Sequence, residues 1–264
     1  SFVSYKPCAI MAGGKAVVVP LHGENGFKLT VRDLEGLVTE KTKVLVFPYP
    51  GNPTGATMSK KDMEELCRFI CEKDLFVLSD EIYAELTYDE PHTSIASMPG
   101  MYERTLVING FSKAFSMTGW RLGYAAGPKE LLEQMTKVHQ FAIMCAPTTS
   151  QYAAIEALKN CDRAVEEMKQ EYNRRRRLVV SKLREMGLPC SDPSGAFYVF
   201  PCIRSTGMTS EEFCQKLLHQ KKIAVVPGDA FGASGEGYVR ISYAYSVERL
   251  NMALTRISEF LQEL

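Results

Sequence analysis

Three short apolar runs, each followed by turn-forming and polar residues, constrain the fold of this chain more than any other feature. The runs occupy residues 43–47, 75–78 and 105–108, and their length and composition predict buried strands. Between the first two, residues 59–73 begin with a capping serine and repeat apolar side chains at helical spacing. Strand, helix and strand in this order predict an α/β fold with a mostly parallel sheet flanked by helices.

A long helical segment precedes a change in the character of the chain after Gly187. Residues 151–183 are charged and helical in spacing, and they are long enough to connect two domains. Later segments predict aromatic and β-branched strands at 195–200, 223–226 and 238–243, with helices at 210–219 and 247–264. We therefore expect a large domain over residues 1–165, and a connecting helix with a smaller C-terminal α+β domain over residues 166–264.

The composition argues against several classes of partner. Lysine plus arginine equals aspartate plus glutamate at 31 each, so the net charge of +0 gives no attraction to nucleic acid or to an anionic membrane. The histidines lack metal-ligand spacing, and the 8 cysteines are scattered without a C-x-x-C pair. We expect free thiols in a reducing compartment, and hence a cytoplasmic protein. We also expect no nucleic-acid, membrane or metal partner.

Polar side chains follow each predicted strand of the large domain, where open α/β sheets place their ligands. Asn52 follows the first strand, Asp80 follows the second, and Lys113 follows the third. Each has an ordinary structural explanation when taken alone: a turn, a helix cap and a surface lysine. A lysine beside Ser112, with Arg121 eight residues later, also suits a reactive amine near a bound phosphate. Their order along the chain favours a single site.

Five motifs carry a specific resemblance. They are NPTG at 52–55, SDEIYAELTY at 79–88, FSKAFSMTGWRLGY at 111–124, GAFYVFP at 195–201, and VVPGDAFG with YVRISYA within 225–244. Together they resemble the class I/II aminotransferases, which are fold-type I enzymes dependent on pyridoxal 5′-phosphate (PLP). The resemblance extends over essentially the whole chain and is strongest to the aspartate and aromatic aminotransferases.

The resemblance implies a role for each matching residue near the cofactor. Lys113 would form the Schiff base with PLP and carry the proton of the reaction. Asp80 would pair with the pyridine nitrogen, while Tyr83 and Asn52 would hydrogen-bond the phenolic oxygen of the ring. Ser112 would help to hold the cofactor phosphate. Asn52 has an alternative explanation, because it could serve only to shape its turn.

Two arginines are implied to bind anionic groups. Arg121 would hold the cofactor phosphate, and Arg240 would bind the α-carboxylate of the substrate. An interdomain ion pair is the alternative for Arg240. The sequence departs from the family pattern at Gly110, where many relatives have serine.

The resemblance implies an amino-acid:2-oxo-acid aminotransferase that acts on aromatic, aspartate or related amino acids as a homodimer. Family chains normally carry a long segment ahead of the position of Ser1, so we expect a large domain that is N-terminally incomplete, from a truncated form or part of a longer protein. The loops offer no obvious second arginine for a dicarboxylate, which favours aromatic or neutral side chains. A PLP-dependent C–S β-lyase and a catalytically inactive fragment are the alternatives.

Overall fold

The computed structural model describes residues 1–264, and these residues form two compact units. Unit 1 consists of Ser1–Leu29, Gly51–Ala56 and Gln170–Leu264, and unit 2 consists of Thr30–Pro50 and Thr57–Lys169. The domain division at 165/166 that the sequence suggests remains a prediction. None of the helices combines the length and the apolar character that crossing a membrane requires.

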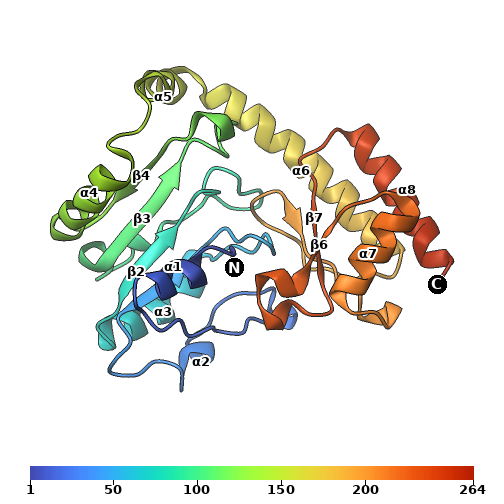
Figure 1. Ribbon diagram of the computed structural model, residues 1–264, viewed down its shortest axis with the longest axis horizontal. Coiled ribbons are helices and arrows are strands. Elements are labelled where there is room, and N and C mark those ends of the chain that lie inside the picture. Colours follow the sequence, from blue (N-terminus) through green and yellow to red (C-terminus); the bar gives the residue numbers. More distant parts are fainter. The chain divides into compact units, whose positions relative to one another are not determined.

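Unit 2 contains the sheet that the apolar runs predict (Figure 1). Its strands, in the order β1-β2-β3-β4, are β1 (Val44–Phe47), β2 (Phe76–Asp80), β3 (Thr105–Gly110) and β4 (Gly123–Ala126). The first three are parallel, and β4 is antiparallel to β3. The mostly parallel sheet that the sequence predicts is therefore confirmed.

Helix α3 (Lys60–Glu72) connects β1 to β2, as its apolar spacing predicts. Ser59 caps it reciprocally: the Ser59 hydroxyl accepts from the backbone N–H of Asp62 at 3.2 Å, and the Asp62 carboxylate accepts from the N–H of Ser59 at 2.9 Å. The side chains that α3 buries are Met63, Leu66, Cys67 and Ile70. This apolar stripe faces the core and holds the helix between the two strands that it connects.

The other helices of unit 2 differ in part from the expected pattern. They are α2 (Val31–Leu34), α4 (Lys129–Ile143), α5 (Thr148–Asn160) and the beginning of α6 (Asp162–Glu185). The sequence predicts one helical segment over 151–183, but α5 ends at Asn160 and α6 starts anew with an acidic residue, Asp162, in its first turn. Helix α4 was missed in the sequence.

Unit 1 is an α+β arrangement around a small antiparallel sheet ordered β5-β7-β6. Its elements are α1 (Tyr5–Met11), the remainder of α6, β5 (Tyr198–Val199), α7 (Ser210–Lys221), β6 (Val226–Pro227), β7 (Val239–Ser242) and α8 (Val247–Gln262). Helices α7 and α8 pack through Phe213 and Phe260, whose rings meet edge to face at 5.4 Å. Strands β5 and β6 are much shorter than predicted because irregular backbone surrounds them.

Short 3-10 helices connect these elements in both units. They are Gly23–Asn25, Ile95–Ser97, Tyr102–Arg104, Thr118–Trp120, Arg204–Thr206, Gly228–Phe231 and Ala233–Gly235.

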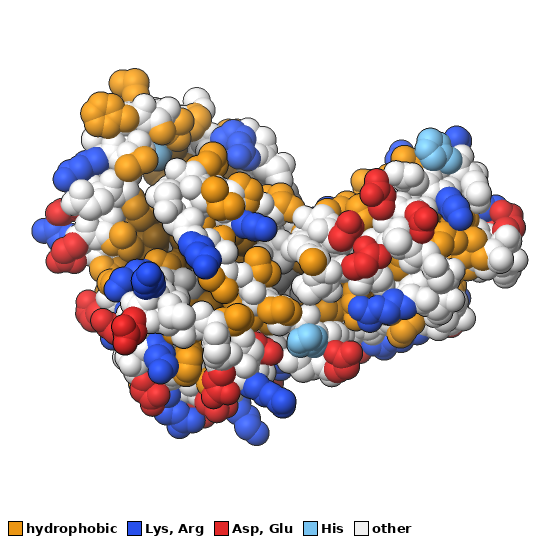
Figure 2. Space-filling model, turned by 60° about the horizontal axis from the view of Figure 1, so that its bottom comes forward, with side chains coloured by type: hydrophobic (Ala, Val, Ile, Leu, Met, Phe, Trp, Pro, Cys, Tyr) orange, Lys and Arg blue, Asp and Glu red, His pale blue; other side chains and the backbone are white.

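Hydrophobic side chains also remain on the surface of unit 2 (Figure 2). The most exposed of them lie on α4 and just after it, where Phe141 is 95% and Met144 is 80% exposed.

Candidate active site

The carboxyl end of β2 supplies an acid and a phenol. Asp80 is the last residue of the strand, and its carboxylate accepts from the backbone N–H of Ile82 at 3.1 Å. The chain then turns, with Ala84 N–H donating to Glu81 C=O and Leu86 N–H donating to Tyr83 C=O, each at 2.9 Å. This turn buries the Tyr83 ring, which is 5% exposed. Both predicted side chains are therefore fixed at the sheet edge where ligands bind.

The carboxyl end of the neighbouring strand β3 supplies the lysine. Gly110 ends β3, and the Lys113 Nζ lies 5.9 Å from the centroid of the Tyr83 ring. A Cβ on Gly110 would stand 2.9 Å from Gly123 Cα across the β3–β4 pair, so the close approach of these strands explains glycine in place of serine. The structure thus brings Asp80, Tyr83 and Lys113 to adjacent strand ends.

The phosphate-binding candidates, Ser112 and Arg121, lie on either side of Lys113 in the sequence. Ser112 is half-buried beside the lysine, whereas Arg121 is exposed just before β4. Arg121 adopts a left-handed backbone with φ of 53°, and its guanidinium donates to Thr118 C=O at 2.8 Å. An open hollow next to it is lined by Ser116, Gly119, Trp120, Arg121, Pro147, Thr149 and Ser150. The Ser150 hydroxyl donates to Trp120 C=O at 2.6 Å and so ties α5 to this loop.

Two of the predicted residues lie together in unit 1. The Arg240 guanidinium on β7 donates to the Asn52 side-chain oxygen at 2.9 Å, although 188 positions separate the two residues. The same guanidinium lies 4.6 Å from the Tyr198 ring centroid and 5.0 Å from that of Phe231. The partners of Arg240 are thus an amide and two aromatic rings, an arrangement that orients a planar cation.

The turn that carries Asn52 depends on a glycine. Gly51 N–H donates to Ala56 C=O and Gly195 N–H donates to Gly55 C=O, both at 2.9 Å. Gly55 has φ of +70°, and a Cβ there would stand 2.3 Å from the Pro193 Cβ. The turn is therefore closed against the segment before β5, and only glycine fits its last position.

One buried acid of the site was missed in the sequence. The Glu81 carboxylate accepts from the Ser79 hydroxyl at 2.9 Å, the Ser94 hydroxyl at 2.7 Å and His92 Nε2 at 2.9 Å. Burial alone would raise the pKa of Glu81, but the bonds from His92, Ser94 and Ser79 hold that pKa below its ordinary value. The only signal in the sequence is an acid that follows another acid at a strand end.

The side chains gathered in unit 2 have the chemistry needed to bind PLP. An acid can pair with a protonated pyridine nitrogen, a phenol with the phenolic oxygen of the ring, and an amine with the aldehyde. A hydroxyl and a guanidinium suit the phosphate. Unit 2 supplies these groups as Asp80, Tyr83, Lys113, Ser112 and Arg121. The fold and this set of side chains define a PLP-dependent enzyme.

Comparison with known proteins agrees with that class. The model of the family "Aminotransferase class I and II" matches residues 1–257. The chain is 53% identical over 266 residues to an aspartate aminotransferase of Pyrococcus abyssi, covering 100% of this chain and 68% of the relative. It is 51% identical over 265 residues to aromatic-amino-acid aminotransferase 2 of Thermococcus litoralis, covering 99% and 68%.

A solved structure gives the same result. The aromatic aminotransferase of Pyrococcus horikoshii superposes with a TM-score of 0.97 at 52% identity, and the match covers 100% of this chain and 71% of that one. The chain belongs to the class I and II aminotransferase family, and it is a PLP-dependent amino-acid aminotransferase.

Proposed function

We propose that this enzyme transfers the amino group between an aromatic or aspartate-type amino acid and a 2-oxo acid, with Lys113 as its catalytic base. The observation that carries the proposal is the position of the Lys113 amine, 5.9 Å from the Tyr83 ring centroid at the strand ends where Asp80 also lies. The names of the aspartate and aromatic relatives support the substrate class.

Each residue has a defined task in this proposal. Bound PLP supplies an electrophilic aldehyde and an electron-accepting ring. Lys113 Nζ moves the proton that leaves the substrate Cα. Asp80 holds a proton at the pyridine nitrogen, and Tyr83 and Asn52 donate hydrogen bonds to the phenolic oxygen.

The anionic ends of cofactor and substrate have separate partners. Ser112 and Arg121 bind the phosphate, the arginine through a charge-assisted contact. Arg240 binds the α-carboxylate with the edge of its guanidinium, whose orientation Asn52 and the Tyr198 and Phe231 rings hold.

The test compares Lys113→Ala with Lys129→Ala, a matched change of an exposed lysine on α4. We expect Lys113→Ala to lower transamination about 10²- to 10⁴-fold, the usual contribution of a general base, and to abolish the visible absorbance that PLP gives with the parent. Lys129→Ala should change neither. Full transamination by Lys113→Ala would refute the assignment. Release of pyruvate and ammonia without an acceptor would identify a β-lyase instead.

A substrate panel tests the proposed specificity. Aromatic amino acids, aspartate and a neutral aliphatic amino acid would each be offered with the same 2-oxo acid, and kcat/KM compared. We expect aromatic amino acids and aspartate to exceed the aliphatic one. A preference for the aliphatic substrate would contradict the proposed class.

We further propose that the enzyme is a homodimer whose subunits meet through the exposed apolar surface of α4 and α5 (Figure 2). That surface carries Val138, Phe141, Met144, Tyr152 and Leu158, exposed by 61% or more. Apolar area of this kind on one face is typical of an interface. Light scattering should find a dimer for the parent and for the control Met252→Glu on α8, and a monomer for Phe141→Glu. A dimer that survives Phe141→Glu would place the interface elsewhere.

We also propose a cytoplasmic location. The support is the set of 8 cysteines, which are free thiols and suit a reducing compartment. Fractionation of the native host, with the protein detected by antibody, tests it. Recovery in an oxidising compartment would contradict it.

A further inference from the structure

Glu81 is a buried acid that none of the proposed catalytic roles uses. Glu81 is 4% exposed, and an ionised carboxylate is unfavourable in the protein interior unless hydrogen bonds replace its water. Three side chains make that replacement, from Ser79 on β2 and from His92 and Ser94 on the segment that follows the turn. Such a cluster directly beside Asp80 calls for an explanation in terms of the site.

The backbone places Glu81 and Asp80 on opposite faces of the sheet. Successive side chains of a strand alternate between faces, and the N–H of Glu81 extends the β2–β3 ladder by donating to Ile108 C=O at 2.8 Å. Glu81 therefore shares the covered face with Val77 and Ser79, both 1% exposed, and the Ser79 bond confirms this orientation. Fixing Glu81 on that face directs the Asp80 carboxylate to the other.

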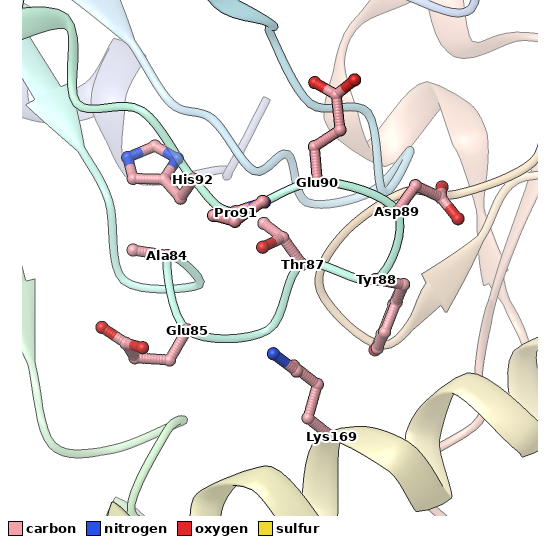
Figure 3. A pocket seen from close by; sticks show the side chains of 9 residues that line it. All are labelled: Ala84, Glu85, Thr87, Tyr88, Asp89, Glu90, Pro91, His92 and Lys169. Atoms are coloured by element: carbon pink, nitrogen blue, oxygen red, sulfur yellow. The ribbon is translucent and has the colours of Figure 1, made fainter.

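Glu81 also holds the start of the turn that carries Tyr83. Its carbonyl accepts from Ala84 N–H at 2.9 Å, while its carboxylate is bound by residues 11 and 13 positions later. Figure 3 shows how the loop between them bends, with His92 on the side of Ala84 and Glu85, and with Glu90 pointing away from them. The loop 84–92 is thus tied back to the strand end by one carboxylate.

The chemistry of the cluster fixes the proton on His92. An ionised carboxylate can only accept, so His92 Nε2 must carry the hydrogen in the 2.9 Å contact with Glu81. Both serine hydroxyls likewise donate to the other carboxylate oxygen. While Glu81 is ionised, these three hydrogen bonds can run in only one direction, from the partners to the carboxylate. The cluster is therefore a rigid attachment point.

We propose that Glu81, bound by Ser79, His92 and Ser94, is a positioning residue that sets the Asp80 carboxylate and the Tyr83 hydroxyl for the cofactor. The inference rests on the proposed roles of Asp80 and Tyr83. A purely stabilising cluster is the simpler alternative, and it predicts a different result: its loss would lower the unfolding temperature without changing the electronic state of the bound cofactor.

The test uses two variants and a control on the full chain. Glu81→Met keeps the bulk of the side chain and removes both acceptor oxygens, and Ser94→Ala removes one donor with little loss of volume. Glu90→Met is the matched control, because Glu90 is exposed on the same loop. For each we would measure the PLP dissociation constant and the midpoint pH of the visible absorbance of the bound cofactor.

We expect Glu81→Met to weaken PLP binding about tenfold, the lower end of what partners of first-contact ligands contribute to affinity in metal sites, and to move the absorbance midpoint. Ser94→Ala should move both in the same direction by less, and Glu90→Met should move neither. Unchanged binding and midpoint in both Glu81→Met and Ser94→Ala would overturn the proposal, even if both variants melted earlier. If Glu81→Met fails to fold, Ser94→Ala decides.

Amide hydrogen exchange without cofactor separates this inference from the proposed function. If the parent gives no absorbance with PLP, the proposed function fails, and exchange over residues 80–86 then decides whether Glu81 holds the turn. We expect exchange there to be about tenfold faster in Glu81→Met, with no change over β1 and none in Glu90→Met. Exchange equal to that of the parent over 80–86 would overturn the inference.

Discussion

Replacing Gly55 by alanine should destabilise the protein far more than the same change at Gly207. The two glycines have nearly identical left-handed backbones, with φ of +70° and +71°. They differ in their surroundings: a Cβ on Gly207 meets nothing within 4 Å, whereas one on Gly55 would stand 2.3 Å from Pro193 Cβ and 2.9 Å from the carbonyl oxygens of Gly195 and Tyr198. Both lie in unit 1, so the pair isolates the contact.

The expected magnitudes follow from these differences. A left-handed alanine costs about 1–2 kcal/mol, and the reduced entropy of the unfolded chain returns about 0.4–1 kcal/mol. Gly207→Ala should therefore lower the free energy of unfolding by about 1 kcal/mol. At Gly55 the neighbours are a proline ring and backbone carbonyls, which cannot rotate away. Overpacking adds about 1–3 kcal/mol, for a total of about 2–4 kcal/mol.

Urea unfolding followed by circular dichroism gives both values by linear extrapolation. A Gly55→Ala variant that unfolds at the same urea concentration as Gly207→Ala would refute the reasoning. Such a result would mean that the segment around Pro193 gives way without cost, and that the turn bearing Asn52 is not closed as the structure has it.

Three further predictions concern single groups. Thr105→Val should raise the free energy of unfolding by about 1 kcal/mol, because the Thr105 hydroxyl is buried without a partner; a loss in thermal or urea unfolding would contradict this. Folding lowers the pKa of Glu81, so the stability that its ionised form contributes is complete above the unfolded pKa of about 4.3 and is lost as pH falls through the folded pKa. Below about pH 4.3 the parent should therefore lose unfolding free energy more steeply than Glu81→Gln. Parallel pH profiles of the two proteins would count against this prediction. Burial and the neighbouring Cys71 raise the pKa of Cys67 to about 11, so iodoacetamide at mildly alkaline pH should label exposed Cys8 and spare Cys67, as peptide mass spectrometry would show; equal labelling would mean that α3 opens.

Local pattern was sufficient for the main elements of the fold. The apolar runs and the capped helix 59–73 appear in the structure as β1, β2, β3 and α3, because buried parallel strands and amphipathic helices have distinct periods. The short strands β5 and β6 were overestimated, since aromatic and β-branched residues there pack as irregular backbone. Strand propensity reflects how side chains pack, and it does not report whether the backbone forms hydrogen bonds with a neighbouring strand.

The site was predictable residue by residue but not as a set of contacts. The motifs identify Lys113 and Asp80, yet nothing in a single sequence indicates that Arg240 bonds to Asn52 across 188 positions. The Glu81 cluster was missed for the same reason, since its partners His92 and Ser94 lie beyond a turn. Long-range pairing is a property of the folded chain, and local spacing does not encode it.

The aromatic rings around Arg240 have a thermodynamic consequence. A free arginine side chain carries about 2 kcal/mol of rotamer entropy, which an ion pair with a ligand would ordinarily consume. Here the Tyr198 and Phe231 rings, at 4.6 and 5.0 Å, confine the guanidinium, and Asn52 fixes its rotation. Much of that ordering occurs when the chain folds. A planar carboxylate that meets this arginine thus encounters a partner already fixed in orientation, and a tetrahedral anion such as a phosphonate would fit the same fixed plane less well.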